Sequence, residues 1–95
     1  MDIVYRQADP LKIGLGQFKS YEEIKGVVRF ELFKEPLYKK QLYNRINASE
    51  HFIYKAFIEL MNEGNLYTIS FVLKEKMGLK DHLNYYSTNP KFRRV

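Results

Sequence analysis

Side chains that can donate hydrogen bonds to anions and to base edges gather near the middle of the chain. His51, Tyr54 and Lys55 are three and four residues apart, so a helix would place them on one face. His51 and Lys55 can donate to guanine N7 or O6, or to a phosphate oxygen. Ser49 and Phe52 belong to the same stretch. Phe52 can contact a thymine methyl, although packing is the more frequent role for an aromatic residue beside an apolar stripe.

Two further groups of basic and aromatic residues flank this stretch in the sequence. Residues 65–95 hold six basic and two acidic residues, so most of the formal net charge of +5 lies there. Such an excess either solubilises the surface or marks the binding site of a polyanion. The first group is Tyr38, Lys39 and Lys40, and the second is Lys74, Lys76, Lys80 and Arg93.

A short helix over residues 38–46, followed by a longer helix over residues 49–62, is predicted to position these side chains. The short helix keeps Leu37, Leu42 and Ile46 on one side. The longer helix has an inward stripe at helical period, formed by Ile53, Ala56, Phe57, Leu60 and Met61. The donor side chains named above would then lie on its outer face.

Both ends of the longer helix carry local signals. Asn47 and Ser49 are suitable N-cap residues, and Asn47 with Glu50 has the spacing of a capping box. Gly64 stands where a helix C-cap favours positive φ.

After Gly64 the apolar pattern changes to period two, which predicts a strand over residues 66–73. A polar loop over 74–80 and a second strand over 82–88 would complete a hairpin within residues 65–88. Residues 89–95 would form a basic tail.

A first helix over residues 20–34 precedes these elements. Ser20 and Glu23 form a capping box, and Gly26 weakens the helix by roughly 1 kcal/mol while leaving room for a close helix contact. Its apolar stripe is Ile24, Val27, Val28 and Leu32.

Residues 1–19 form an N-terminal arm in which Gly14-Leu15-Gly16 is a loop. The arm is too apolar for a free tail, so it should pack on the domain or on a second subunit. Its apolar residues include Ile3, Val4, Leu11, Ile13 and Leu15.

A set of residues between positions 36 and 66 resembles, in type and in sequence order, the winged-helix DNA-binding domains of PadR and MarR-type regulators. The resemblance implies one α+β domain over residues 1–95, a winged helix-turn-helix with three helices and a C-terminal two-stranded wing. It also implies a recognition helix in the major groove, a phosphate contact from Tyr54, and a minor-groove or phosphate contact from the wing tip. The matching positions are Pro36-Leu37-Tyr38, Ser49, Ile53-Tyr54-Lys55-Ala56-Phe57, Leu60, Glu63-Gly64 and Leu66.

Composition and motifs argue against other classes of protein. The chain has no cysteine, and its two histidines, His51 and His82, lack the spacing of a helical metal pair. Neither a phosphate-binding loop nor a nucleophile motif is visible, so we expect no enzyme activity, metal or cofactor. No apolar run is long enough to span a bilayer, which makes a cytoplasmic protein without a membrane partner the expectation.

Sequence-specific binding of double-stranded DNA is the function that the sequence favours. We expect a small transcription regulator that acts as a homodimer through residues 1–35. The helices over residues 49–62 of the two copies would then lie on one side of the dimer. One alternative is a centromere-binding plasmid partition protein, since some small archaeal partition proteins are PadR-like. A second alternative is a winged-helix module that binds further protein partners instead of DNA, which the acidic Glu50 and Glu59 favour.

Overall fold

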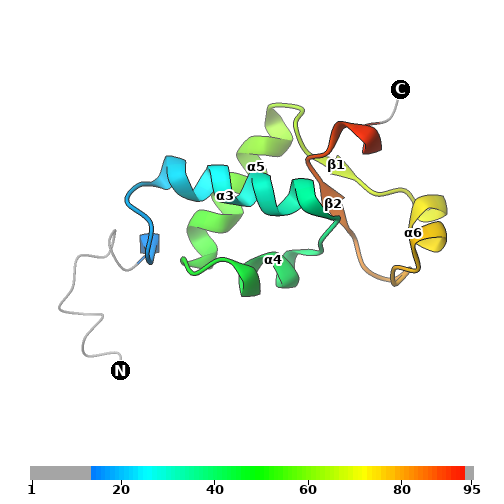
Figure 1. Ribbon diagram of the computed structural model, residues 1–95, viewed down its shortest axis with the longest axis horizontal. Helices are drawn as coiled ribbons and strands as arrows, with labels where there is room; N and C mark the ends of the chain where they lie inside the picture. The colour runs from blue at the N-terminus through cyan, green and yellow to red at the C-terminus, as the bar shows by residue number, and fades with distance from the viewer. Residues whose placement is uncertain (1–13, 94–95) are drawn as a thin grey trace.

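The computed structural model describes residues 14–93, which form an α+β structure (Figure 1). From residue 21 to residue 93 the chain contains four α-helices and one two-stranded antiparallel hairpin. No helix in this range is long and apolar enough to cross a membrane. The elements are α3 (Tyr21–Lys34), α4 (Lys39–Arg45), α5 (Glu50–Asn62), β1 (Tyr67–Thr68), α6 (Phe71–Met77), β2 (Tyr86–Ser87) and the 3-10 helix η1 (Pro90–Phe92).

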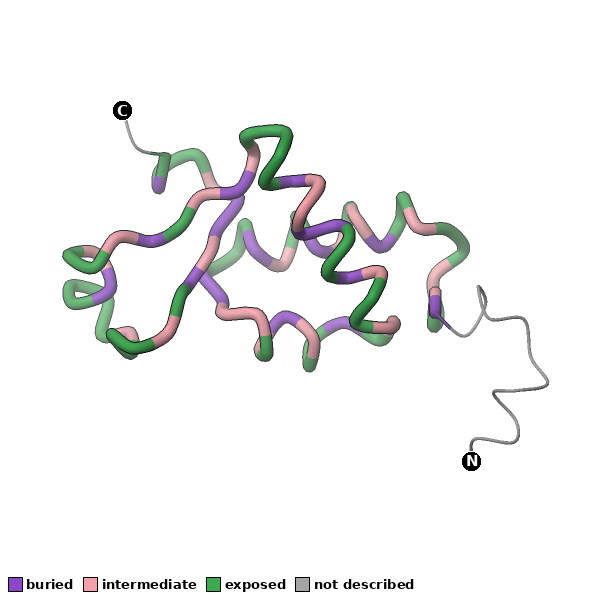
Figure 2. The backbone as a smooth tube through the Cα atoms, turned by 180° about the vertical axis from the view of Figure 1, so that it is seen from behind, coloured by how far each residue is buried: buried purple, intermediate pink, exposed green. Residues whose placement is uncertain are grey.

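The main core lies between α3, α4 and α5, where the predicted apolar stripes meet. Figure 1 shows α3 crossing in front of α5, and Figure 2 shows buried and exposed residues alternating along the helices. The apolar stripe predicted for α3 therefore packs inside its own domain. The best-buried members of this core are Ile24, Val28, Leu32, Leu37, Leu42, Ile53, Ala56, Phe57 and Leu60.

Serine caps begin the two long helices, as the sequence predicts for Ser20 and for Ser49, one of its two candidate caps of α5. The Ser20 hydroxyl accepts from the Glu23 amide at 3.3 Å, and the Glu23 carboxylate accepts from the Lys19 amide. The Ser49 hydroxyl caps α5 by accepting from the Phe52 amide, so the capping box of Asn47 with Glu50 is wrong. Gly64 has φ +77°, which confirms its predicted place after α5.

The segment between α3 and α4 is extended at Leu37, where it pairs with the hairpin. The Leu37 amide donates to the Tyr86 carbonyl at 3.0 Å, and the Tyr86 amide donates back at 2.8 Å. On its other edge β2 pairs antiparallel with β1, with Thr68 opposite Tyr86. Residue 37 therefore fixes the start of α4 against the central strand.

The predicted long strands over 66–73 and 82–88 are wrong, because most of the connecting segment folds differently. Only two residues on each side pair, and α6 occupies residues predicted as strand and loop. The Ser70 hydroxyl caps α6 by accepting from the Leu73 amide, and Gly78 ends α6 with φ +71°. A local helix with its own caps satisfies the backbone that a longer ladder would otherwise have paired.

A second small cluster holds this extension to the C-terminal segment. It contains Ile69, Tyr85 and Phe92, all buried. Phe92 belongs to η1, so residues 90–92 pack on the hairpin and are not a loose basic tail. Residues 94–95 lie outside the described range.

The end of the N-terminal arm packs on its own domain. Leu15 and Phe18 contact the main core, and the Gly14 carbonyl accepts from the Ser49 amide at 2.8 Å. Gly16 has φ +61°, so it turns the chain beside the α4–α5 junction. The arm residues Ile3, Val4, Leu11 and Ile13 lie outside the described range.

Candidate nucleic-acid interface

The outer face of α5 presents the polar and aromatic side chains predicted for it. His51 and Lys55 are exposed, and the Tyr54 ring is 43% exposed. Ile53, Ala56 and Leu60 point into the core on the opposite side, as predicted from the apolar stripe. The Ser49 side chain caps the start of α5 just before His51. The exposed face therefore begins in the first turn of this helix.

The start of α4 is joined to this face through Lys39. The Lys39 ammonium lies 5.2 Å from the centroid of the Tyr54 ring and 5.3 Å from that of Phe57. A cation over an aromatic ring is attracted to the ring's negative face. Lys39 and Tyr54 therefore belong to one continuous surface, although they come from different helices.

A hollow continues this surface toward the hairpin. Its volume is about 230 Å³, and it separates the first turn of α4 from the segment that leads into β2. Two ammonium groups and an amide side chain at its rim can donate hydrogen bonds to an anion. Its lining residues are Tyr38, Lys39, Lys40, Leu83, Asn84 and Tyr86.

Lys55 points toward α3 instead of toward α4. Its ammonium lies 4.5 Å from the centroid of the Tyr21 ring. The Tyr21 hydroxyl donates to the Glu59 carboxylate at 2.7 Å, and Lys25 also pairs with Glu59 at 3.3 Å. The hydrogen bond from Tyr21 and the ammonium of Lys25 together lower the pKa of Glu59, and the charge of Lys55 adds to this effect. Lys55 thus faces an anionic neighbour within its own chain.

Ser49 and Phe52 have structural roles in this region. The Ser49 hydroxyl caps α5, and the Phe52 ring packs against Tyr21 at 6.0 Å between centroids. A Cβ at Gly14 would come within 2.4 Å of the Phe52 ring, so the arm covers that ring closely. Packing, and not contact with a thymine methyl, is the role that this geometry gives to Phe52.

The three lysines predicted to bracket the wing tip, Lys74, Lys76 and Lys80, differ in exposure. Lys74 is 7% exposed, and its ammonium donates to the carbonyls of Asp81 at 2.8 Å and Leu83 at 2.9 Å. The expectation that Lys74 brackets an exposed tip is therefore wrong, because the side chain closes the α6 turn from inside. Lys76 and Lys80 are exposed and remain available to an anion.

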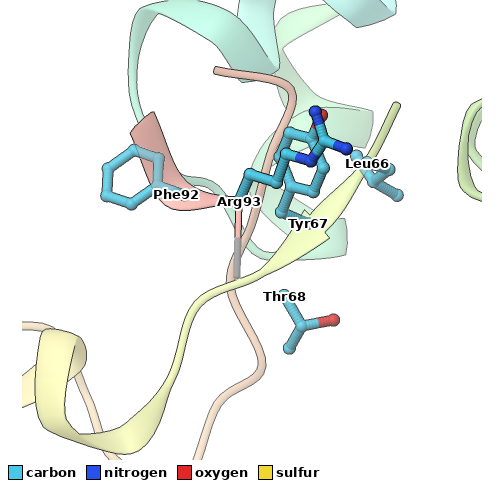
Figure 3. A pocket seen from close by; sticks show the side chains of 5 residues that line it. All are labelled: Leu66, Tyr67, Thr68, Phe92 and Arg93. Carbon is cyan, nitrogen blue, oxygen red and sulfur yellow. The ribbon is translucent and has the colours of Figure 1, made fainter. Parts of the chain in front are cut away.

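Arg93 lies apart from the α4–α5 surface. It lines a cavity of about 480 Å³ between η1 and the edge of β1, together with Leu66, Tyr67, Thr68 and Phe92 (Figure 3). Arg93 is exposed at this edge, and none of the residues that line the cavity with it belongs to α4 or α5.

Asn84 is a residue of this surface that the sequence did not reveal. The period-two pattern placed it in the middle of a strand, whereas it lies in the loop before β2 and lines the hollow beside Lys39. Asparagine is depleted in strands and enriched in loops, and that was the signal present in the sequence.

The described residues contain no cluster of three or more metal-ligating side chains. The chain's α+β arrangement of four helices and a hairpin is compatible with a winged helix. No family model, curated protein or solved structure matches the chain.

Proposed function

We propose that this protein is a winged helix-turn-helix that binds double-stranded DNA, with α5 as the recognition helix. The observation that carries the proposal is the contact of Lys39 with Tyr54, which unites the cationic start of α4 with the exposed face of α5. In a helix-turn-helix the second helix enters the major groove while the first approaches the backbone. α4 and α5 have the order and the short connection that this docking requires.

Each part of the surface has a distinct task in this proposal. His51 and Tyr54 on α5 face the groove, and Lys39 and Lys40 at the hollow contact a phosphate of the adjoining backbone. Lys76 and Lys80 contact phosphate further along the duplex. The extension between β1 and β2 serves as the wing, held in shape by Lys74 inside it.

We further propose sequence-specific binding as a small transcription regulator. A role in plasmid partition would use the same DNA surface. A second candidate function, binding to another protein, is favoured by the apolar side chains that α6 leaves exposed. Those side chains are Phe71, Val72 and Met77.

Selection of bound duplexes from a random pool tests the proposal. We expect enrichment of one sequence, with a footprint covering the major groove, and binding that weakens steeply as salt rises. Binding to the enriched duplex that is no tighter than to random duplex would remove the regulator proposal. A complete lack of binding at low salt would instead favour the protein-binding candidate.

A further inference from the structure

The outer edge of β1 carries backbone groups that the hairpin does not pair. β2 lies between β1 and Leu37, because the Tyr86 amide and carbonyl both bond to Leu37. Thr68 stands opposite Tyr86, so these two residues form a pair without hydrogen bonds between them. The Thr68 amide and carbonyl therefore point away from β2. No backbone hydrogen bond from another described segment reaches either group.

Leu66 continues this outer edge one step earlier in the chain. The Thr88 amide donates to the Leu32 carbonyl at 3.1 Å, away from β1, just as the Tyr86 amide is directed away from it. Backbone groups at every second residue of a strand face the same edge. Leu66 and Thr68 thus share the outer edge, roughly 6.8 Å apart, which is the repeat at which an extended peptide presents its own amides and carbonyls.

A cavity of about 480 Å³ opens on this edge. Figure 3 shows Leu66, Tyr67 and Thr68 along β1, with Phe92 and Arg93 of the η1 segment beside them. The Arg93 side chain extends past Tyr67 toward Leu66 (Figure 3). The Phe92 and Arg93 amides donate within the η1 segment, so this segment borders the edge without pairing with it.

The charge at the cavity is positive and has no counterpart in the described chain. Arg93 is exposed, and no carboxylate of residues 14–93 forms an ion pair with it. None of the residues that line the cavity is acidic. A guanidinium binds a carboxylate through two parallel hydrogen bonds, which fix its position as well as adding binding energy. The cavity is therefore complementary to an acidic side chain.

We propose that the outer edge of β1 binds an extended peptide that carries an acidic residue and adds a strand to the hairpin. The peptide backbone pairs with Leu66 and Thr68, and its carboxylate binds Arg93. In strand addition the main-chain hydrogen bonds supply affinity and the side-chain contacts supply selectivity. The site is separate from the proposed DNA surface, since no residue of α4 or α5 lines the cavity.

The carbonyl groups of the edge favour a peptide over a phosphate of a nucleic acid. A phosphodiester can accept from Arg93 and from the Thr68 amide, but it has no donor for the carbonyls of Leu66 and Thr68. A peptide supplies an amide for each carbonyl and a carbonyl for each amide. Only a peptide therefore uses both kinds of group on the edge together with the guanidinium.

Selection from a display library of random hexapeptides, with the full chain and no DNA, gives the probe. We expect enriched peptides to combine an acidic residue with β-branched or aromatic residues, which favour extended backbone. A synthetic peptide of the enriched sequence should slow hydrogen exchange at the Leu66 and Thr68 amides. N-methylation of alternate peptide residues should abolish binding in one set of positions and be tolerated in the other. Failure to enrich a peptide, or tolerance of N-methylation at every position, overturns strand addition.

Variants of the protein test the two halves of the site. Arg93→Gln should raise the Kd of the peptide about tenfold. Lys91→Gln makes the matched change on η1 outside the cavity and should leave the Kd unchanged. Thr68→Pro removes the outward amide and should also weaken binding, because an edge strand accepts proline where the nitrogen faces away from its neighbour. Circular dichroism checks folding, and if Thr68→Pro does not fold, Arg93→Gln and the N-methylated peptides still decide. An Arg93→Gln chain that binds the peptide normally overturns the proposal, and a lowered salt slope of its DNA binding would then assign Arg93 to phosphate.

Discussion

The Lys39 ammonium lies 5.2 Å from the centroid of the Tyr54 ring, so the first residue of α4 is fixed over the exposed face of α5. Neither residue alone defines a surface. Together they place a positive charge beside the side chains that would face the major groove. The position of Lys39 depends in turn on Leu37, whose two backbone hydrogen bonds to Tyr86 hold the start of α4 against the hairpin.

Removing the positive charge at this junction should weaken binding to all duplexes alike. If Lys39 and Lys40 each contact a phosphate, Lys39→Gln with Lys40→Gln should lower the salt slope of log K by about two, or about one per contact. Lys91→Gln is the matched control, because this lysine lies over the Phe92 ring of η1, away from the junction. The measurement is binding to a labelled duplex over a salt series. An unchanged slope in the double variant would separate these lysines from phosphate.

Lys74 and Lys76 should respond differently to the same substitution. Lys74→Met removes the donor to two carbonyls in a buried site, which should lower the free energy of unfolding by about 1–3 kcal/mol. Lys76 is exposed, so Lys76→Met should change the free energy of unfolding by less than about 0.5 kcal/mol. The same substitution should lower the salt slope of DNA binding. Urea unfolding of both variants gives the comparison. Equal stability of the two would show that Lys74 does not hold the α6 turn.

The core helices were predictable because their residues interact within a few positions along the chain. The structure confirms the cap at Ser20 and four residues of the predicted α5 stripe, Ile53, Ala56, Phe57 and Leu60, whereas the fifth, Met61, is 39% exposed. The direction of Lys39 toward Tyr54 was not predictable, since it follows from how α4 packs on α5. The pairing of Leu37 with Tyr86 was hidden for the same reason, because it joins distant residues.

The extension between β1 and β2 shows where period alone misleads. Residues 66–73 alternate as a strand does, yet Ser70 and Gly78 stand at the two ends of a helix of seven residues. A serine cap and a glycine stop were present in the sequence and favoured a helix. The burial of Lys74 could not be foreseen, because lysine is almost never buried without partners and its partners here are backbone carbonyls.

Gly16 should be the most sensitive glycine of the described chain. It has φ +61°, and a Cβ there would come within 1.8 Å of the Asn47 carbonyl oxygen. Gly16→Ala should therefore lower the free energy of unfolding by more than about 1 kcal/mol, through both backbone strain and this clash. Gly26→Ala is the matched control. It should raise stability by up to about 1 kcal/mol, because its surroundings are open and alanine favours a helix. Thermal unfolding measures both, and a neutral Gly16→Ala would contradict the turn.

The contact between α3 and α5 should make stability depend on pH through Lys25. Lys25 pairs with Glu59 and Glu63, and the pKa of each carboxyl lies below its ordinary value of 4.5. For Glu59 the hydrogen bond from Tyr21 is the largest cause, and for Glu63 it is the hydrogen bond from Lys25. A lowered folded-state pKa adds stability that is present above pH 4.5 and lost as pH falls through the folded value.

Lys25 has the opposite sign. Its pKa is raised above 10.5 by the hydrogen bond to Glu63, so its contribution is complete below pH 10.5 and is lost at higher pH. The stability difference between the natural chain and Lys25→Met should therefore be greatest near neutral pH and shrink below pH 4.5. Urea unfolding over pH 3 to 7 (roughly the span in which carboxyls titrate) measures it, with Lys91→Met as control. A difference that stays constant over this span would show that the carboxyls do not depend on Lys25.

His51 should carry sequence discrimination if α5 occupies the major groove. The side chain is exposed in the first turn of α5, where recognition helices contact base edges. His51→Ala should cost about 1–3 kcal/mol on the duplex recovered by selection and less on random duplex. Lys55→Ala should weaken both duplexes more evenly, because its ammonium is directed toward Tyr21 and Glu59. His82→Ala makes the same chemical change at a side chain 72% exposed on the hairpin loop, and it should leave discrimination unchanged. Equal losses for His51→Ala on selected and random duplexes would reassign His51 to the phosphate backbone.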